Sequence, residues 1–408
     1  MTKMALPFLG LDLKSDETNV TPGAVREARN VRIDRRGNFR RRRGWAVVDT
    51  GPDWRSLFAW QGRLIAQSGR QLFSLDPEGL SRELLGELGA DDPVDFAIYN
   101  NDLYIVNSAA LWRLVDGQLA RAGVEPGSLP RVADAGAGQL TAGSYRVAVA
   151  LVSPAGEESP AYDLGQHELS RGLVLEELEQ RFGHRWRVYI TPPDGNALYL
   201  TEEFDAVWPR YVVTLYPEGA PCETLNSSRL PGGHFVRGAG GRIYVARGDT
   251  LWFSDAFRPH LMSARHNFVR FVGNIRILLF VEGGAFVGDD RGVWWLPGSD
   301  PSAWAMTLAS TAPAVSRSGV LVPSYKIGPL QSGAAQDCAL WLSTEGHMVG
   351  TGGGSVHALN ADRVYLRDGQ VGKSTLVERD GGVHVYTLTS SRDSTGDARG
   401  AVDTKSRV

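Results

Sequence analysis

The feature that most constrains this chain is a recurring hairpin unit: a short apolar strand, a tight polar or glycine-containing turn, and a second strand that carries an aromatic residue. Leu64 and Leu103 occupy equivalent positions 39 residues apart in two copies, and Ile243 and Phe286 do so 43 residues apart in two others. A repeat of about 40–45 residues is typical of the blades of a β-propeller. Weaker copies follow at residues 339–349, 363–366 and 375–387, so we expect five or six blades.

The regular spacing is interrupted in the middle of the chain. Leu103 and Ile243 are 140 residues apart, which leaves roughly 100 residues beyond one blade, the size of a small β-sandwich. Apolar residues alternate between positions 145 and 151 and between 186 and 190, which favours strands with one buried face. Only residues 174–182, which include three glutamates, favour a helix. We therefore predict an all-β chain in which a fibronectin- or immunoglobulin-like β-sandwich at residues 131–225 interrupts the propeller.

The other segments complete the expected domain organisation. Residues 1–28 are expected to form an extended N-terminal arm, and the propeller then comprises residues 29–130 and 226–388. Residues 389–408 consist mainly of Ser, Thr, Gly, Asp and Arg, so we expect a flexible C-terminal tail. With 48 glycines, 11 Trp, 12 Tyr and 14 Phe in 408 residues, the composition suits hairpins better than helices.

Composition and spacing exclude several classes of site. The two cysteines, Cys222 and Cys338, form no CxxC pair, which excludes a structural zinc site. His347 and His357 lie on neighbouring expected strands, where two histidines alone indicate a contact pair and not a metal site. The longest apolar stretches are far shorter than the ~18 residues of a membrane span. We therefore expect no metal, no cofactor and no membrane-spanning segment.

Catalytic motifs are incomplete. Residues 290–295 contain Asp-x-Gly-x-x-Trp, which is similar to the Asp-box turn of sialidase-type propellers, where these residues have a structural role. A glycosidase needs two carboxylates set across a cleft, and no such pair can be chosen from the scattered Asp and Glu residues. We expect no catalytic residue and keep a glycan-active propeller enzyme as the least favoured alternative.

The strongest local charge lies near the N-terminus, although the net charge of −3 gives no general preference for nucleic acid. Seven of the twelve residues from 32 to 43 are arginine: Arg32, Arg35, Arg36, Arg40, Arg41, Arg42 and Arg43. A hairpin turn at residues 35–38 would make this segment a two-stranded ribbon, which we call the arginine ribbon. One interpretation is a solvated edge, or pairing with acidic residues of a neighbouring subunit. The other is a guanidinium patch that faces phosphates. Because guanidinium groups suit fixed anionic partners, we predict that the ribbon lies at a subunit interface or a channel wall.

Several short motifs resemble those of one protein family. Asn-Val-Arg-Ile-Asp at residues 30–34, followed by Gly37 and Arg43-Gly44, resembles the N-terminal signature of virion proteins from tailed bacteriophages, as does Pro-Phe-Leu-Gly at residues 7–10. Residues 143–147 and 156–160 are similar to the inserted fibronectin-like domain of these proteins, and residues 243–254 and 292–301 to their later blades. The family that the chain resembles is the β-propeller tail hub or nozzle of short-tailed phages, also called the packaged-DNA stabilisation protein.

This resemblance implies a structural role. It implies a homo-oligomeric ring, with six chains expected, below the portal and adaptor rings. The lumen of that ring would continue the DNA channel, help to retain packaged DNA and conduct it at ejection. The implied partners are further copies of the chain, the portal and adaptor ring, distal tail proteins or fibres, and DNA bound without sequence specificity. The expected location is the virion tail, and the host cytoplasm during assembly. The alternative is a tail-tip or receptor-facing propeller that acts as a binding module.

Overall fold

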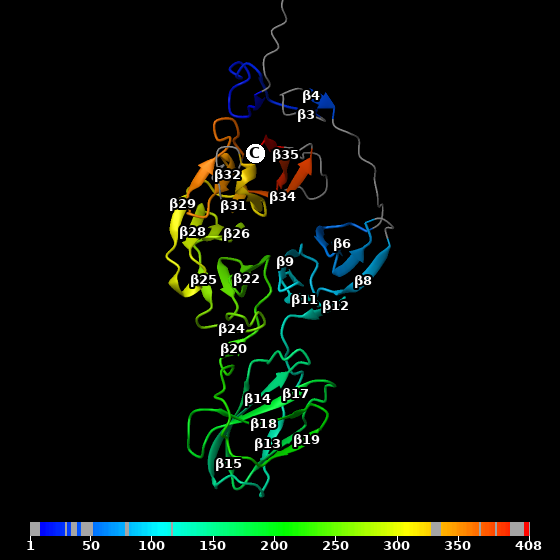
Figure 1. Cartoon of the computed structure of the whole chain (residues 1–408), viewed down its shortest axis with the longest axis vertical. Coiled ribbons are helices and arrows are strands. Elements are labelled where there is room, and N and C mark those ends of the chain that lie inside the picture. Colours follow the sequence, from blue (N-terminus) through cyan, green and yellow to red (C-terminus); the bar gives the residue numbers. More distant parts are fainter. Residues whose placement is uncertain are drawn as a thin grey trace, which may run out of the picture.

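The computed structural model describes residues 9–28, 31–33, 39–41, 52–77, 81–115, 117–327, 336–366, 369–379, 382–391 and 404–407. Within these ranges the regular structure is β-strand, apart from two single-turn 3-10 helices, η1 (Pro301–Ala303) and η2 (Ser324–Lys326). Figure 1 shows a circle of small sheets and, below it, a separate β-unit. No helix in the described ranges is long and apolar enough to cross a bilayer. The predicted all-β class is confirmed.

Six antiparallel sheets form the circle, and each takes its strands in chain order, as propeller blades do. Sheet 1 contains β5 (Ser56–Trp60), β6 (Arg63–Ser68), β7 (Gln71–Leu75) and β8 (Arg82–Glu87). Sheet 2 contains β9 (Asp95–Tyr99), β10 (Asp102–Val106), β11 (Leu111–Val115) and β12 (Gln118–Arg121). Sheet 3 contains β21 (Phe235–Ala239), β22 (Arg242–Arg247), β23 (Thr250–Phe253) and β25 (Phe268–Arg270).

The second half of the circle comes from the C-terminal part of the chain. Sheet 4 contains β26 (Ile277–Val281), β27 (Gly284–Gly288), β28 (Val293–Pro297) and β29 (Thr307–Ser310). Sheet 5 contains β30 (Val320–Pro323), β31 (Asp337–Ser343), β32 (Gly346–Gly350) and β33 (Val356–Ala358). Sheet 6 has three described strands, β34 (Gln370–Arg379), β35 (Gly382–Ser391) and β36 (Thr404–Arg407).

Two-residue turns join the first and second strands of sheets 1, 2 and 3. Their residues, Gln61-Gly62, Asn100-Asn101 and Gly240-Gly241, all have φ between 48° and 76°. These angles are typical of the type I′ turn, whose twist matches that of the flanking strands. Asn and Gly adopt this conformation readily, so the local sequence selects the hairpins of sheets 2 and 3. Gln61 adopts it against its own preference.

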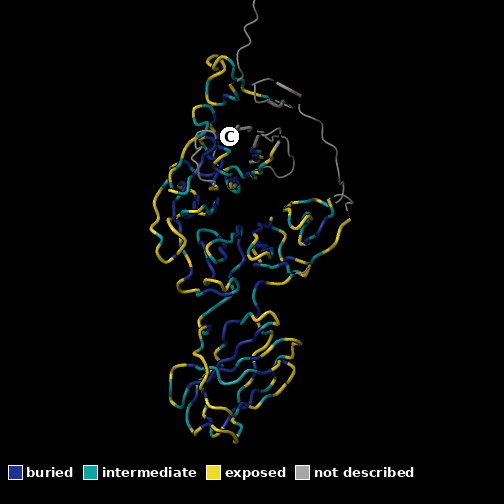
Figure 2. The backbone as a smooth tube through the Cα atoms, viewed as in Figure 1, coloured by how far each residue is buried: buried dark blue, intermediate teal, exposed yellow. Residues whose placement is uncertain are grey.

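Each sheet packs on the next sheet in the chain. Ile65 and Leu72 of sheet 1 share a core with Leu103 and Ile105 of sheet 2. Clusters of the same kind join sheets 2 and 3, 3 and 4, 4 and 5, and 5 and 6. Among the described residues, no such cluster joins sheet 6 to sheet 1. Figure 2 shows that the buried residues follow the sheets, whereas the connecting loops are mostly exposed. These antiparallel sheets around a common centre form the propeller-like architecture that the repeat predicts.

The separate unit lies between β12 and β21 in the chain and consists of two sheets. One sheet has the order β13 (Arg131–Asp134), β16 (Leu173–Glu176), β19 (Arg210–Val213). The other has the order β15 (Tyr162–Leu169), β14 (Gly143–Val152), β17 (Arg185–Ile190), β18 (Tyr199–Asp205). Tyr145 and Trp186 from the second sheet share one buried core with Leu173 and Leu175 from the first. A short pair, β20 (Ser227–Ser228) with β24 (Met262–Ser263), follows where the chain returns to the circle.

The structure corrects two expectations for local elements. The helix expected at residues 174–182 is wrong, because residues 174–176 belong to β16, which pairs with β13 on one side and β19 on the other. This ladder buries Leu173, Val174 and Leu175 and so overrides the local helical pattern. The hairpin copy expected at residues 363–366 is also wrong. There the backbone N–H groups of Arg363 and Val364 both donate to the carbonyl oxygen of Asn360 in a turn.

The described parts of both terminal segments pair with other parts of the chain. In the arm, β1 (Gly10–Leu11) pairs in parallel with β2 (Ala24–Val25), and the N–H of Leu13 donates to the carbonyl oxygen of Arg363 at 2.7 Å. Residues 404–407, expected within a flexible tail at 389–408, form β36 and pair with β35. The N–H and C=O groups of paired strands bond to one another whatever side chains the strands carry. A polar composition therefore does not prevent this pairing.

Candidate functional site

The arginine ribbon lies partly within the described residues. β3 (Val31–Ile33) pairs antiparallel with β4 (Phe39–Arg41), which places Arg32 opposite Arg40. Arg41 is exposed. Arg35, Arg36, Arg42 and Arg43 lie outside the described residues, and the placement of the ribbon at an interface or channel wall stays a prediction.

The first strands of the sheets meet around a buried carboxylate, Asp95, which begins β9. Its side chain is 7% exposed, and its Oδ2 lies 2.5 Å from Nη1 of Arg237 on β21. The backbone N–H of Val236 donates to the same oxygen at 3.1 Å. Nζ of Lys373, on β34, lies 3.9 Å from the other oxygen, Oδ1. One carboxylate therefore links sheets 2, 3 and 6 at the centre of the circle.

Arg317 completes this axial cluster, which we define as Asp95, Arg237, Arg317 and Lys373. Arg317 precedes β30 and has a left-handed backbone with φ of 65°. Its guanidinium donates to the carbonyl oxygen of Pro93 at 3.3 Å and lies 5.6 Å from the ring centroid of Phe235. Nε of Arg237 also donates to the carbonyl oxygen of Leu278 on β26, at 3.1 Å. Charged side chains from several sheets thus converge at the centre of the circle.

The axial cations keep Asp95 ionised. Burial by itself raises the pKa of this carboxyl, but Arg237, Lys373 and Arg317 outweigh burial and hold its pKa below the usual 3.8. A buried carboxylate that is paired and hydrogen-bonded in this way becomes destabilising when its partners are removed. The cluster therefore stabilises the contact between the first strands of sheets 2, 3 and 6.

A second buried titratable group lies between sheets 5 and 6. Nε2 of His347, on β32, lies 3.3 Å from Oγ1 of Thr387 on β35, and its Nδ1 has no partner among the described residues. Burial lowers the pKa of His347 to about 4, so the ring is neutral at pH 7. His357, on the next strand, is exposed. In the described part of the chain, no group of three or more His, Cys, Asp or Glu is placed to hold a metal ion.

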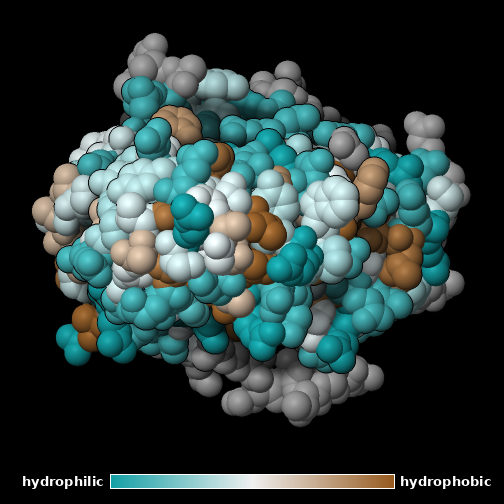
Figure 3. All heavy atoms as spheres, turned by 90° about the horizontal axis from the view of Figure 1, so that it is seen from below, coloured by the Kyte–Doolittle hydropathy of each residue, from teal (hydrophilic) through white to brown (hydrophobic). Residues whose placement is uncertain are grey.

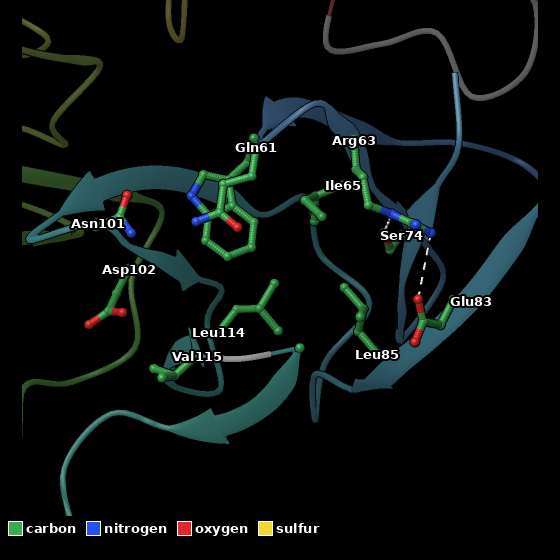
Figure 4. Close-up of a pocket in the computed structure, with 12 residues that line it drawn as sticks. Gln61, Arg63, Ile65, Ser74, Glu83, Leu85, Asn101, Asp102, Leu114 and Val115 are labelled. Carbon is green, nitrogen blue, oxygen red and sulfur yellow. Dashed lines mark hydrogen bonds and ion pairs between the residues drawn. The ribbon is translucent and has the colours of Figure 1, made fainter. Parts of the chain in front are cut away.

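A pocket of about 230 Å³ lies between sheets 1 and 2. Figure 4 shows Ile65, Leu85 and Leu114 directed toward its middle, with Gln61 and Asn101 at the rim. The pocket therefore combines an apolar floor with a polar rim, which is the usual chemistry of small-molecule sites.

The charged side chains that line this pocket are already paired. Nε of Arg63 donates to Oγ of Ser74 at 2.5 Å, and Nη2 of Arg63 lies 3.5 Å from Oε2 of Glu83. Oδ2 of Asp102 lies 2.9 Å from Nε and 2.6 Å from Nη2 of Arg113. Among the described lining residues, no charge is left without a counter-charge.

Three neutral polar groups of the pocket residues, one buried and two exposed, find no partner among the described residues. Nε1 of Trp60 is buried and finds no acceptor among the described residues, which costs about 1–3 kcal/mol. The side-chain amides of Gln61 and Asn101 make no hydrogen bond to a described residue. Both amides belong to the type I′ turns at the rim, in adjacent sheets.

Two exposed aromatic side chains lie on neighbouring loops of the separate two-sheet unit. Phe182 is 94% exposed and Trp208 is 55% exposed. Their loops lie side by side, because the N–H of Arg181 donates to the carbonyl oxygen of Ala206 at 2.6 Å. We call Phe182, Val207 and Trp208 the aromatic patch. Seen from the end that this unit forms, the surface is mostly hydrophilic with separate hydrophobic spots (Figure 3). Exposed aromatic residues of this kind are typical of protein–protein contacts.

The sequence analysis missed the axial cluster, the pocket and the aromatic patch, each for a different reason. The members of the axial cluster are far apart in the sequence, and their only local signal is a charged residue inside a buried strand, such as Asp95 between Val94 and Phe96. The pocket rim could have been located from the two-residue turns Gln61-Gly62 and Asn100-Asn101. The aromatic patch carries the weaker signal of an aromatic residue beside a turn-forming glycine or proline.

Comparisons with known proteins give structural similarity only. No protein-family model and no curated protein matches the chain. The N-terminal domain of Nup159 is 14% identical, with 83% of this chain and 73% of that chain covered and a TM-score of 0.33. The Pan2 WD40 domain of Neurospora crassa is 10% identical, with 83% and 86% covered and a TM-score of 0.32. A putative 6-phosphogluconolactonase of Bacteroides fragilis is 13% identical, with 86% and 95% covered and a TM-score of 0.31. Similarity at this level assigns no function to the chain. The description of the fold depends only on the sheets and their buried cores.

Proposed function

We propose that the chain is a structural protein of a phage tail, which forms a ring below the portal and adaptor and continues the DNA channel. The N-terminal, insertion and blade motifs described above support this proposal. In it, the six sheets are six blades, and the two-sheet unit is an inserted fibronectin- or immunoglobulin-like sandwich. The chain acts through assembly and without catalysis.

The observation that carries the proposal is the aromatic patch. Phe182 and Trp208 are large, exposed side chains on two neighbouring loops of a unit that lies below the circle of sheets in Figure 1. Leaving such residues in water is unfavourable for an isolated chain, whereas burying them stabilises an interface. In a heterologous ring the patch of one copy would contact a different surface of the next copy.

The axial cluster bears on where DNA would pass. Ion pairs at the centre of the circle link sheets 2, 3 and 6. DNA would therefore pass through a lumen between subunits and not along the axis of one propeller. In this arrangement the arginine ribbon faces either that lumen or the acidic surface of a neighbouring subunit, where guanidinium groups find fixed anions.

The aromatic patch can be tested by its effect on incorporation. We expect the double variant Phe182→Ser, Trp208→Ser to enter particles at least tenfold less than the unaltered chain, because the interface loses its buried aromatic contacts. The measurement is the amount of tagged chain in gradient-purified phage particles. The matched control is Phe257→Ser, because Phe257 is 82% exposed but lies on the circle of sheets. Normal incorporation of the double variant would remove the patch from the proposed interface.

The arginine ribbon can be tested by charge reversal. We expect Arg40→Glu, Arg41→Glu, Arg42→Glu to give a folded chain that fails to enter particles or to retain packaged DNA, because the carboxylates repel the anions that the ribbon binds. The control reverses three exposed arginines elsewhere: Arg171, Arg265 and Arg291. Particles that assemble normally and stay infectious with the ribbon variant would make the ribbon a solvated edge.

A receptor-facing propeller at the tail tip is the second candidate. The pocket between sheets 1 and 2 favours it, because a small-ligand site is of use to a binding module and is not needed by a ring. The two candidates differ in position, since the ring lies at the portal end of the tail and the module at its distal end.

A further inference from the structure

We infer that the pocket between sheets 1 and 2 binds a neutral monosaccharide unit. This inference does not rest on the proposed function, because the pocket is formed within a single chain. It follows from the size of the pocket, from its charge balance, and from two exposed amides at its rim that bond to no described residue.

The size limits the ligand to a single ring. The volume of about 230 Å³ falls below the range of about 300–1,000 Å³ that is typical of sites for drug-sized molecules. The apolar floor of Ile65, Leu85 and Leu114 can cover one face of such a ring. A longer ligand would have to extend past the rim into solvent.

The charge balance favours a neutral ligand. The guanidinium of Arg63 faces Glu83, and the carboxylate of Asp102 is held by Arg113. An anion or a cation would have to compete with these existing pairs, because no lining charge among the described residues is free to receive it. A neutral ligand can use the remaining lone pairs and N–H groups of these pairs without breaking them.

The unpartnered groups show what the ligand must supply. Gln61 and Asn101 are exposed at the rim, and the amide of each offers a donor and an acceptor side by side. A sugar carries a hydroxyl on nearly every carbon, and each hydroxyl donates and accepts, so one ring can replace water on both rim amides. A nucleobase has fewer polar edge atoms and would leave part of this rim unpaired.

Backbone strain at Gln61 points to the same groups. Gln61 has φ of 48°, a left-handed conformation that glutamine disfavours. The equivalent turn of sheet 3 is Gly240-Gly241, which meets the same geometric requirement without strain. Residues held in unfavourable backbone conformations are concentrated at binding sites. A contact between the Gln61 amide and a ligand would explain why glutamine occupies this position.

Binding can be tested on the full-length protein by saturation-transfer NMR and calorimetry. The probes are methyl glycosides of glucose, galactose, mannose and N-acetylglucosamine, with adenosine and uridine as neutral ring-sized comparisons. We expect at least one glycoside to bind with a dissociation constant of about 1 mM or tighter, which corresponds to weak but specific recognition. No binding by any glycoside, or binding by the nucleosides alone, would overturn the inference.

Two variants and one control connect binding to the pocket. Gln61→Gly and Asn101→Gly remove the rim amides but retain residues that the type I′ turn accepts, as Gly240-Gly241 shows. We expect each variant to weaken glycoside binding at least tenfold while keeping the circular dichroism and melting behaviour of a folded chain. Asn100→Gly changes the neighbouring residue of the same turn, which does not line the pocket, and should bind as the unaltered chain does. Unchanged binding in both rim variants would place the ligand elsewhere and overturn the inference.

Discussion

Replacing Asp95 by asparagine is expected to lower the free energy of unfolding of the propeller by about 3 kcal/mol. The variant keeps the shape of the side chain but removes the negative charge that faces Arg237, Lys373 and Arg317. Arg237 then stays at the centre of the circle without its counter-charge, which is the costly outcome for a buried ion pair. Urea denaturation followed by tryptophan fluorescence measures the change as a lower midpoint at unchanged slope.

The pH dependence supplies a second readout for Asp95. Because its pKa in the folded chain lies below 3.8, the carboxylate contributes stability at and above that pH. This contribution falls as the pH drops through the lowered pKa. The variant should therefore lose less stability than the unaltered chain below pH 3.8.

Asp91→Asn is the matched control for Asp95. The Asp91 side chain is 73% exposed and lies 4.0 Å from Arg55, so its loss should cost at most about 1 kcal/mol. Equal effects of the Asp91 and Asp95 variants would show that the axial cluster does not hold the first strands together.

Trp186→Ala is expected to destabilise the two-sheet unit by about 3–5 kcal/mol and to leave the propeller unchanged. Trp186 is fully buried in a core that contains only residues between 124 and 213, and its Nε1 donates to the carbonyl oxygen of Glu179 at 3.1 Å. Scanning calorimetry should therefore show one transition at lower temperature and a second at its original temperature.

The control for Trp186 is Trp208→Ala on the same unit. Trp208 is more than half exposed, so the expected change in unfolding free energy is within about 0.5 kcal/mol. If Trp186→Ala instead shows a single transition at a lower temperature, the two-sheet unit does not unfold separately from the propeller, and the prediction is wrong.

The hairpins were predictable from sequence because their signals are local. The apolar strand pairs at residues 63–75, 103–114, 242–254 and 284–296 are confirmed as β6–β7, β10–β11, β22–β23 and β27–β28. Their pattern combines buried apolar residues with short turns, and both act within a few residues. The outer strands escaped notice because their side chains are largely exposed, as in Arg82–Glu87 of β8.

The other features depend on contacts between distant segments. Residues 174–176 form a strand because β13 and β19 lie on either side of them, and nothing within the segment encodes those neighbours. Asp95 meets Arg237 and Lys373 only after sheets 2, 3 and 6 have come together. The aromatic patch likewise needs two loops to lie side by side. For this reason the repeat pattern predicts the architecture well and the candidate sites poorly.

Electron microscopy of phage particles that carry a tagged copy of this chain tests the central claim most directly. The account predicts label in a closed ring at the portal end of the tail, with several copies around an open lumen. Label confined to the distal tip would support the receptor-facing module, and a chain absent from purified particles would contradict the proposed function altogether.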